Sequence, residues 1–475
     1  MADSLAMKTI SELAPLIEKK EISPVDVAVD IMERIKLFDN EINSYIYVTP
    51  EERVIELAKN AETEIVSGNY KGPLHGIPLA LKDIFSVEGE VATIGSKIHG
   101  DYIAEQDATV VQKLKESGAF FTGKLNLHEY ASGGTTLNEH YGACRNPWDT
   151  SRIPGGSSGG SGAAVAADLT IASLGTDTGG SIRIPASANG IVGLKPTHGL
   201  VSKFGCFPLS WSLDHIGPMT KNVTDAAILL EQIVGFDSQD ATSIKAPKTA
   251  YQEALTGDIT GKIIGIEESY FFKEVDNEVA ELVRQGIQTL EKMGAKIEIV
   301  KAPSLKYAEY AEFMTLFGET ALIHKKNMLE RPEDFGPSVR NSFLLANMIT
   351  SDQYLEAQQI RRMMALDFEE IWSKVDAIVA PTMPIIPFKI GENRVKINGE
   401  EFSAHHSLGR LNGPANLLGL PSIAVPCGFA QDMPIGMQII GAPLSEATLL
   451  NLAYAFEKSN PLQGRKPNLT VAVSN

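Results

Sequence analysis

The sequence predicts an α/β fold in which strands and helices alternate in layers. Two short apolar strands are predicted at 77–81 and 119–122, with a helix between them that starts near Asp107. The same strand–helix–strand order recurs in the second half of the chain. Because such alternation is typical of layered α/β proteins, these two units predict the fold class.

The second unit has strands at 262–266 and 296–300, joined by an amphipathic helix over 277–292. A helix-rich stretch over 306–374 follows it. The remaining elements are predicted strands at 375–381, 422–426 and 436–440, and a closing helix at 446–458.

The first seventy residues are predicted to be helical. Ser23-Pro24 and Thr49-Pro50 each offer an N-cap followed by a proline at the first helical position. Glu52 stands where it would complete a capping box with Thr49.

Composition and charge narrow the class of partner. The chain has 475 residues, 43% of them apolar, and a net charge of −17, so it can bury a large core but offers no broad basic face. We expect a small-molecule substrate and no nucleic acid. The first residues lack a signal-peptide pattern, and the longest apolar run, 417–430, is short and broken by prolines, so no membrane span is expected. The three cysteines form no C-x-x-C pair, which favours a reducing, cytoplasmic location.

Two runs rich in glycine and serine, at 154–164 and 175–187, are the candidate site. Glycine lets the backbone approach a ligand closely, and successive backbone N–H groups can hold a developing negative charge. Gly156 to Gly160 matches the G-x-S-x-G elbow with Ser158 as the nucleophile, but the preceding residues are too polar for the strand that this elbow requires. A flexible linker is the other interpretation, and the apolar run at 163–167 argues against it.

The base that would activate a serine is less evident. None of the nine histidines lies in an H-E-x-x-H pattern, so no metal is expected, and His405 and His406 are predicted to lie in an exposed loop. Lys82 stands inside the apolar run 76–85, where burial would lower the pKa of its amine. The residues alone also allow, and favour, a structural ion pair between Lys82 and Asp83.

Several ordered motifs together resemble the amidase signature family, and they extend over nearly the whole chain. They are GIP at 76–78 with Lys82-Asp83, PGGSSGGS at 154–161, GTDTGGSIRIP at 175–185, GLKPT at 193–197, SLDHIGP at 212–218 and NLLGLP at 416–421. The resemblance implies a mixed β-sheet covered by helices on both faces. It also implies one domain over 1–475, with N-terminal helices at about 1–70, a catalytic core at about 71–240 and a substrate-pocket half at about 241–475.

The resemblance further implies a Ser-cisSer-Lys triad that forms an acyl-enzyme. Matched residue by residue, Ser181 is the nucleophile, Ser157 the bridging serine after a cis peptide bond, and Lys82 the base. No cofactor is implied. Asp177 and Arg183 are expected to pair and hold the nucleophile loop. The expected oxyanion hole consists of backbone N–H groups of Thr178, Gly179, Gly180 and Ser181.

Two kinds of family member remain as candidates. One hydrolyses small amides by itself, with esters and carbamates as further acyl classes; the other is the A subunit of a glutamine-dependent aspartyl/glutamyl-tRNA amidotransferase. The arginine and aspartate that hold glutamine in that second kind fall at Asn341 or Ser342 and at Gly409, so neither charge is present. With Trp211 as an apolar wall, the sequence favours a hydrolase of small uncharged amides, with Trp211, Asn341 and Gly409 as pocket candidates. A homodimer is compatible with this prediction.

Overall fold

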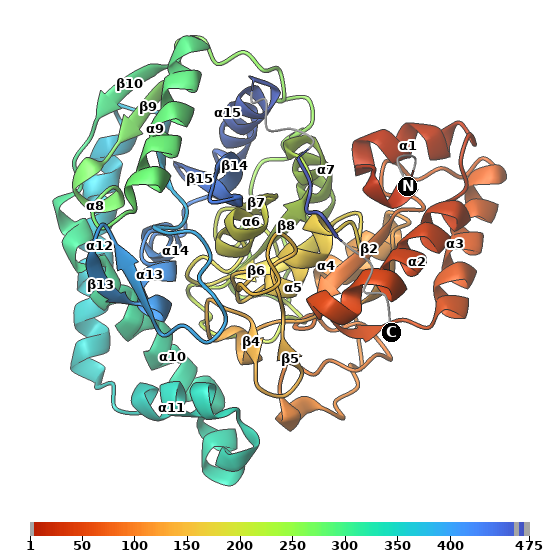
Figure 1. The fold of residues 1–475 in the computed structure, drawn as a ribbon, viewed down its shortest axis with the longest axis horizontal. Coiled ribbons are helices and arrows are strands. Elements are labelled where there is room, and N and C mark those ends of the chain that lie inside the picture. Colours follow the sequence, from red (N-terminus) through yellow and green to blue (C-terminus); the bar gives the residue numbers. More distant parts are fainter. Residues whose placement is uncertain (1–3, 460–464, 470–475) are drawn as a thin grey trace.

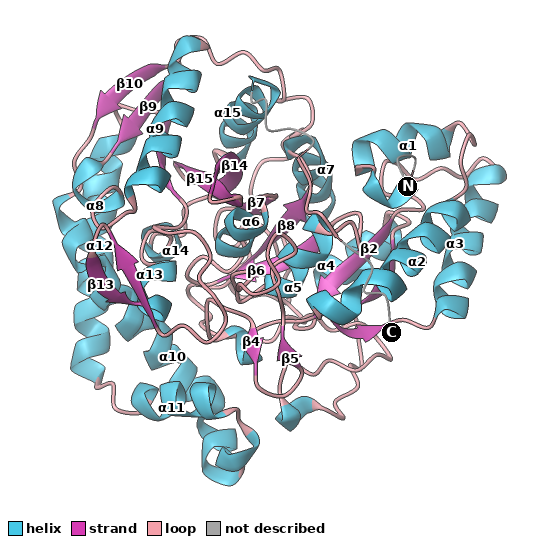
Figure 2. Ribbon diagram, in the orientation of Figure 1, coloured by secondary structure: helices cyan, strands magenta, loops and turns pink. Residues whose placement is uncertain are grey.

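A long mixed β-sheet runs through the molecule (Figures 1 and 2). The computed structural model describes residues 4–459 and 465–469, without the side chains of 405–407. Within these residues, eleven strands pair in the order β1-β3-β2-β6-β8-β7-β14-β15-β11-β9-β10. Their bounds are β1 Tyr45–Val48, β2 Pro78–Lys82, β3 Phe120–Leu125, β6 Ser173–Asp177, β7 Val192–Lys195, β8 His215–Thr220, β9 Ile263–Ile266, β10 Lys296–Ile299, β11 Ala377–Pro381, β14 Ser422–Ala430 and β15 Met433–Gly441.

Helices cover both faces of this sheet, as the sequence predicts (Figure 2). Two small hairpins, β4–β5 (Leu137–Asn138, Gly142–Ala143) and β12–β13 (Arg394–Ile397, Glu400–Ser403), lie outside it. The helices are α1 Ile10–Glu18, α2 Pro24–Ile42, α3 Glu51–Val66, α4 Thr109–Glu116, α5 Gly159–Ala166, α6 Arg183–Asn189, α7 Val223–Ile233, α8 Glu268–Phe271, α9 Asn277–Lys292, α10 Ala308–Glu330, α11 Pro337–Ala346, α12 Ser351–Trp372, α13 Ala404–Gly409, α14 Gly413–Leu417 and α15 Glu446–Ser459.

Both predicted strand–helix–strand units are present. β2 and β3 pair in parallel around α4, and β9 and β10 pair in parallel around α9. The sheet is mixed because β8, β7, β14 and β15 join its middle with antiparallel pairings. These central strands connect the halves of the chain, so residues from both halves can meet near one site.

Three local predictions need correction or addition. Ser23 caps α2 as predicted, but α3 begins one residue later than expected, with Pro50 at the N-cap and no bond from Thr49. The reason is that Thr49 extends the pairing of β1, its N–H donating to Thr122 O at 2.9 Å. His405 and His406 belong to α13 and not to a loop. Within the described residues of the main sheet, four strands were not predicted: β1, which lies in the first seventy residues predicted to be helical and is held by pairing with β3, and β6, β7 and β8.

No helix in the described ranges combines the length and the apolar character that a bilayer span requires.

Candidate active site

Lys82 lies at the end of β2, fully buried, and its amine faces three hydroxyl groups. Lys82 Nζ is 2.7 Å from Ser157 Oγ, 2.9 Å from Ser158 Oγ and 2.7 Å from Thr176 Oγ1. The predicted bridging serine and the predicted base are therefore in direct hydrogen-bond contact, although 75 residues separate them in the chain.

The residues alone favour an ion pair between Lys82 and Asp83, and this prediction is wrong. Asp83 instead pairs with buried Lys124, whose Nζ lies 2.8 Å from Asp83 Oδ1. Neighbouring residues of a strand point to opposite faces of the sheet, so adjacent side chains such as these cannot readily share one site. Lys82 is thus left among hydroxyls, and no carboxylate of the described residues is in contact with its amine.

Burial is the main cause of an altered acidity at Lys82. It lowers the pKa of the amine to about 7, and the more distant charges of groups such as Asp214 and Asp177 only partly offset this effect. A lysine with this pKa is substantially neutral near physiological pH. Its amine can then accept a proton.

The first glycine-serine run turns from an irregular loop into α5 beside Lys82. The Gly156–Ser157 peptide bond is cis, as the resemblance implies. Ser158, the candidate of the elbow interpretation, is fully buried at the start of α5, and its hydroxyl donates to Thr176 O at 3.2 Å. Ser161 donates to Leu174 O at 3.4 Å. Both hydroxyls thus donate to backbone oxygens of β6, and the Ser158 hydroxyl also accepts from the Lys82 amine at 2.9 Å.

Ser181 lies in the turn that leads from β6 to α6. Its carbonyl oxygen accepts from the Ser158 N–H at 3.3 Å, so the two glycine-serine runs are in contact through their backbones. The Ser181 hydroxyl makes no hydrogen bond within the described residues. Lys82 and Ser157 are therefore brought together directly, and Ser181 is brought to them through Ser158.

The backbone around Ser181 differs in one respect from the expected oxyanion hole. The Gly180 N–H donates to Asp177 Oδ1 at 2.8 Å and is thus already engaged. Within the described chain, the N–H groups of Thr178, Gly179 and Ser181 donate to no other residue. These three remain as candidate donors to an oxyanion.

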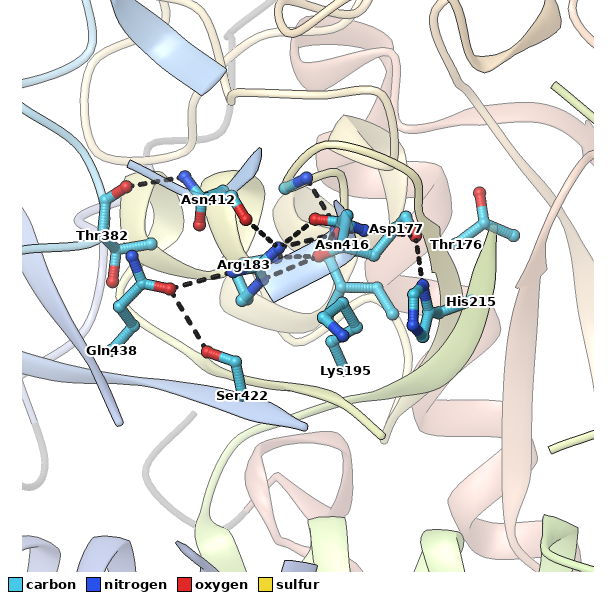
Figure 3. Close-up of polar contacts among 12 residues, drawn as sticks. Thr176, Asp177, Arg183, Lys195, His215, Thr382, Asn412, Asn416, Ser422 and Gln438 are labelled. Carbon is cyan, nitrogen blue, oxygen red and sulfur yellow. Dashed lines mark hydrogen bonds and ion pairs between the residues drawn. The ribbon is translucent and has the colours of Figure 1, made fainter. Parts of the chain in front are cut away.

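A buried ion pair between Asp177 and Arg183 holds the loop that carries Ser181 in place (Figure 3). Arg183 Nε lies 3.0 Å from Asp177 Oδ2, Arg183 Nη2 lies 3.0 Å from Oδ1, and neither side chain is exposed. The Asp177 carboxylate also accepts from the Ile182 N–H at 3.2 Å. Although burial alone raises the pKa of Asp177, the Arg183 charge and its hydrogen bonds hold it below its ordinary value. The predicted pairing of Asp177 with Arg183 is confirmed.

The same ion pair reaches the second half of the chain. Arg183 donates to Asn416 Oδ1 at 2.6 Å, to Gln438 Oε1 at 2.9 Å and to Asn412 O at 3.1 Å, and Asn416 donates to Asp177 Oδ1 at 2.8 Å (Figure 3). Lys195 lies in the same close-up without a carboxylate partner, and its amine donates to the backbone oxygens of Leu420 and Pro196. The network therefore positions the nucleophile loop from both halves.

A cavity of about 290 Å³ opens beside the loop. Thr176 of β6 and Thr178 of the loop line it, together with Phe207 and Trp211, which supply apolar walls. The charged residues Lys203, Asp214 and Asp240 line it as well. Cys206 also lines it, but burial raises the pKa of that thiol to about 12, so it is not a thiolate at neutral pH.

The three pocket candidates differ in position. Trp211 lines the cavity and is 52% exposed, and its role as a substrate-pocket residue stays a prediction. Gly409 lies against the loop, because a Cβ added to it would stand 3.4 Å from Gly179 O. Asn341 is exposed on α11 and does not line this cavity, so the prediction for it is not supported by its place.

Two residues near the site were not singled out from the sequence. Thr176 contacts the Lys82 amine, and Glu312 of α10 places its carboxyl against Gly179. Thr176 lies within the second glycine-serine motif, so its position was a usable signal. The only signal for Glu312 is its spacing with buried Ala308 and Thr315 on one helix face.

The comparisons with known proteins agree with this geometry. Residues 26–450 match the model of the Amidase family. The chain therefore belongs to the amidase signature family, and it is an amide-hydrolysing enzyme.

Individual relatives cover nearly all of the chain. The A subunit of the glutamyl-tRNA(Gln) amidotransferase of Moorella thermoacetica is 40% identical over 487 residues, which cover 98% of this chain and 99% of the relative. A solved structure from a vestigial protein complex, which bears on the origins of an s-triazine catabolic enzyme, has a TM-score of 0.92 at 33% identity and covers 98% of this chain and 100% of its own. A bacterial aryl acylamidase has a TM-score of 0.88 at 28% identity, with 96% of each chain covered.

Removing the Asp177 charge should strongly destabilise the protein. Asp177→Asn leaves Arg183 buried without its counter-charge, and breaking a buried pair in this way costs about 3–5 kcal/mol. We expect the free energy of unfolding in urea to fall by that amount. Glu370→Gln, which breaks the exposed pair with Lys374, is the control and should leave it nearly unchanged. Equal effects of the two substitutions would contradict the central role of the buried pair.

Proposed function

We propose that this enzyme hydrolyses the C–N bond of small carboxylic amides through Ser181, Ser157 and Lys82. The observation that carries the proposal is the buried Lys82 amine, which lies 2.7 Å from Ser157 Oγ and contacts no carboxylate in the described ranges. A neutral amine in that position can take a proton from a serine relay.

In the first half of the reaction, Ser181 Oγ attacks the substrate carbonyl carbon. The Ser181 proton passes to Ser157, and the Ser157 proton passes to Lys82. The tetrahedral intermediate then collapses, and the relay returns a proton to the leaving nitrogen, which departs as ammonia or an amine. What remains is an ester between the acyl group and Ser181.

In the second half, water attacks the acyl carbon and gives its proton to the same relay. The ester bond breaks, Ser181 regains its proton, and the carboxylic acid leaves. This sequence requires a hydrogen bond between Ser181 and Ser157, which is not present among the described residues. Catalytic hydrogen bonds commonly tighten only when the substrate is bound, and the proposal requires this one to form then.

The oxyanion of both intermediates would be held by backbone N–H groups. We assign this role to Thr178, Gly179 and Ser181, whose N–H groups donate to no other described residue. Because such donors are preoriented by the protein, each is worth about 2.7–4 kcal/mol in the transition state.

For the substrate, the cavity residues support small uncharged amides. Phe207 and Trp211 offer apolar contacts beside the charged residues Lys203, Asp214 and Asp240, which also line the cavity. Gly409, which lies against the loop, carries no charge where a glutamine-binding aspartate is expected. The structural similarity to an aryl acylamidase is in keeping with this class. Esters and carbamates, a cytoplasmic location and a homodimer stay predictions.

The second candidate is the glutamine-hydrolysing component, the A subunit, of a glutamine-dependent tRNA amidotransferase. The observation that favours it is 40% identity over nearly the full length to a protein of that name, and overall sequence similarity supports it better than the first candidate. Such a protein would hydrolyse glutamine by the same triad, together with partner proteins.

Replacing the nucleophile should abolish turnover without unfolding the protein. We expect Ser181→Ala to lower kcat for release of 4-nitroaniline from 4-nitroacetanilide by about 10⁴-fold or more. Ser161→Ala is the matched control, since its hydroxyl makes only a 3.4 Å bond to a backbone oxygen, and it should keep most of the activity. Unchanged turnover in Ser181→Ala would rule out the proposed mechanism.

The rate should rise with pH as Lys82 loses its proton. Below a pKa of about 7 the amine is protonated and cannot accept a proton, so kcat/KM should fall about tenfold per unit of pH on the acid side. Lys82→Arg should be inactive at every pH, because arginine stays charged. A pH profile that is flat from pH 5 to pH 8 would speak against Lys82 as the base.

Ammonia release from glutamine separates the two candidates. The first predicts turnover of aryl and aliphatic amides by the purified chain and little glutaminase activity. The second predicts glutaminase activity that rises when the other components of a glutamyl-tRNA amidotransferase are added, and inertness toward simple amides. The measurement is ammonia released with and without those components.

A further inference from the structure

Glu312 is a carboxyl group at the proposed site that the proposed mechanism does not use. It lies in α10, one turn from buried Ala308 and Thr315, so it stands on the helix face that points into the protein. Helix α10 belongs to the second half of the chain, and the loop that carries Ser181 belongs to the first.

The carboxyl of Glu312 is seated against two glycines. A Cβ added to Gly179 would collide with Glu312 Oε1, and a Cβ added to Gly413, at the start of α14, would collide with Oε2. Each glycine thus leaves the space that one carboxyl oxygen occupies. Gly179 is also one of the candidate oxyanion donors, so this carboxyl is directly beside the place where the scissile carbonyl would bind.

No protein group satisfies this carboxyl. Within the described residues, Glu312 forms no hydrogen bond and no ion pair. Arg183, whose charge lowers the pKa of Glu312, has its donors engaged with Asp177, Asn416, Gln438 and Asn412. Glu312 is partly exposed, so its carboxyl, seated against Gly179 and Gly413 without a protein partner among the described residues, is open to a partner supplied from outside.

The acidity of Glu312 agrees with its surroundings. Burial raises the pKa of its carboxyl to about 8; the neighbouring charge of Asp177 acts in the same direction, and that of Arg183 opposes it. The group can therefore meet a substrate as a neutral acid, or give up its proton when a cation binds.

We propose that Glu312 binds a nitrogen-borne hydrogen of the substrate and so selects amides whose acyl part carries an N–H group. This inference rests on the proposed function. The nitrogen concerned is not the leaving one, because the leaving nitrogen must face Ser157 to be protonated, whereas Glu312 lies against Gly179 and Gly413. Among the described residues, Glu312 forms no hydrogen bond with Ser157 or Lys82. It is a second nitrogen, held by Glu312 while Gly179 holds the oxyanion.

The shared chemistry is an N–H donor, and two sources supply it: a neutral amide N–H and a charged ammonium group. Two pairs of near-isosteric probes separate them. N-acetylglycinamide and 4-oxopentanamide differ by NH against CH₂, and glycinamide and propionamide differ by an amino group against a methyl group. Ammonia release measures kcat/KM for all four.

For the wild type, we expect about tenfold or greater preference for the N–H member of at least one pair, as the loss of one buried hydrogen bond predicts. Glu312→Leu should bring that ratio to about one. Glu312→Gln should keep a preference for the neutral amide, since its amide oxygen still accepts, but lose a preference for the ammonium. Glu330→Gln, an exposed carboxylate on the same helix, is the control and should change nothing.

A ratio near one in the wild type for both pairs, or a ratio unchanged in Glu312→Leu, would overturn the proposal. Thermal unfolding of each variant checks that the fold is intact, and Glu312→Gln keeps the shape of the side chain if the leucine variant fails to fold.

Binding measured without turnover separates this proposal from the proposed function. Calorimetric titration of the same four probes into Ser181→Ala, with and without Glu312→Leu, should show the same loss of preference. If the triad substitutions leave turnover intact, the proposed function fails while this binding comparison still decides the role of Glu312. If the triad substitutions abolish turnover as expected but Glu312→Leu leaves the binding preference unchanged, only the present inference fails.

Discussion

The buried pair of Asp177 and Arg183 is the interaction on which the rest of the site depends. Asp177 closes the turn before α6 by accepting from the N–H groups of Gly180 and Ile182, while Arg183 connects that turn to Asn416 and Gln438. Two opposite charges without solvent are tolerated only when their remaining donors and acceptors are satisfied. Here the backbone of the loop and side chains of the second half satisfy them together. The pair thus joins the nucleophile loop and the strands that complete the sheet into one structure.

At Lys82, unlike at the Asp177–Arg183 pair, a buried charge-bearing group has no ion-pair partner among the described residues. Its amine has three hydroxyl neighbours and, within the part of the chain that the structure describes, no carboxylate in contact. Burial therefore lowers its pKa, because no ion pair in that part of the chain balances the effect. The nearest carboxylate in the sequence, Asp83, lies on the other face of the strand with Lys124. One buried lysine is thereby suited to proton transfer and the other to structure, within one small part of the sheet.

Local signals in the sequence predicted much of the fold. The hydrophobic periodicity of 277–292 predicted α9 with its bounds, and Ser23-Pro24 predicted the start of α2, because both depend on residues close together in the chain. The Thr49-Pro50 pair predicted the start of α3 one residue too early, because the Thr49 backbone is hydrogen-bonded to a distant strand. Strands β6, β7 and β8 were missed because they are short, contain glycine, proline or polar residues, and are stabilised by pairing with one another.

By itself, the sequence determined the fold class, the family and the residues matched to its triad, because ordered motifs such as those at 154–161 and 175–185 can be recognised directly in the amino-acid sequence. Only the tertiary structure decided that Lys82 faces Ser157 and not Asp83, that the Gly180 N–H is engaged by Asp177, and that Glu312 lies against Gly179. The physical reason is that each of these facts is a contact between segments far apart in sequence or a choice of strand face. Strand pairing and side-chain packing fix such contacts, and residue order alone does not.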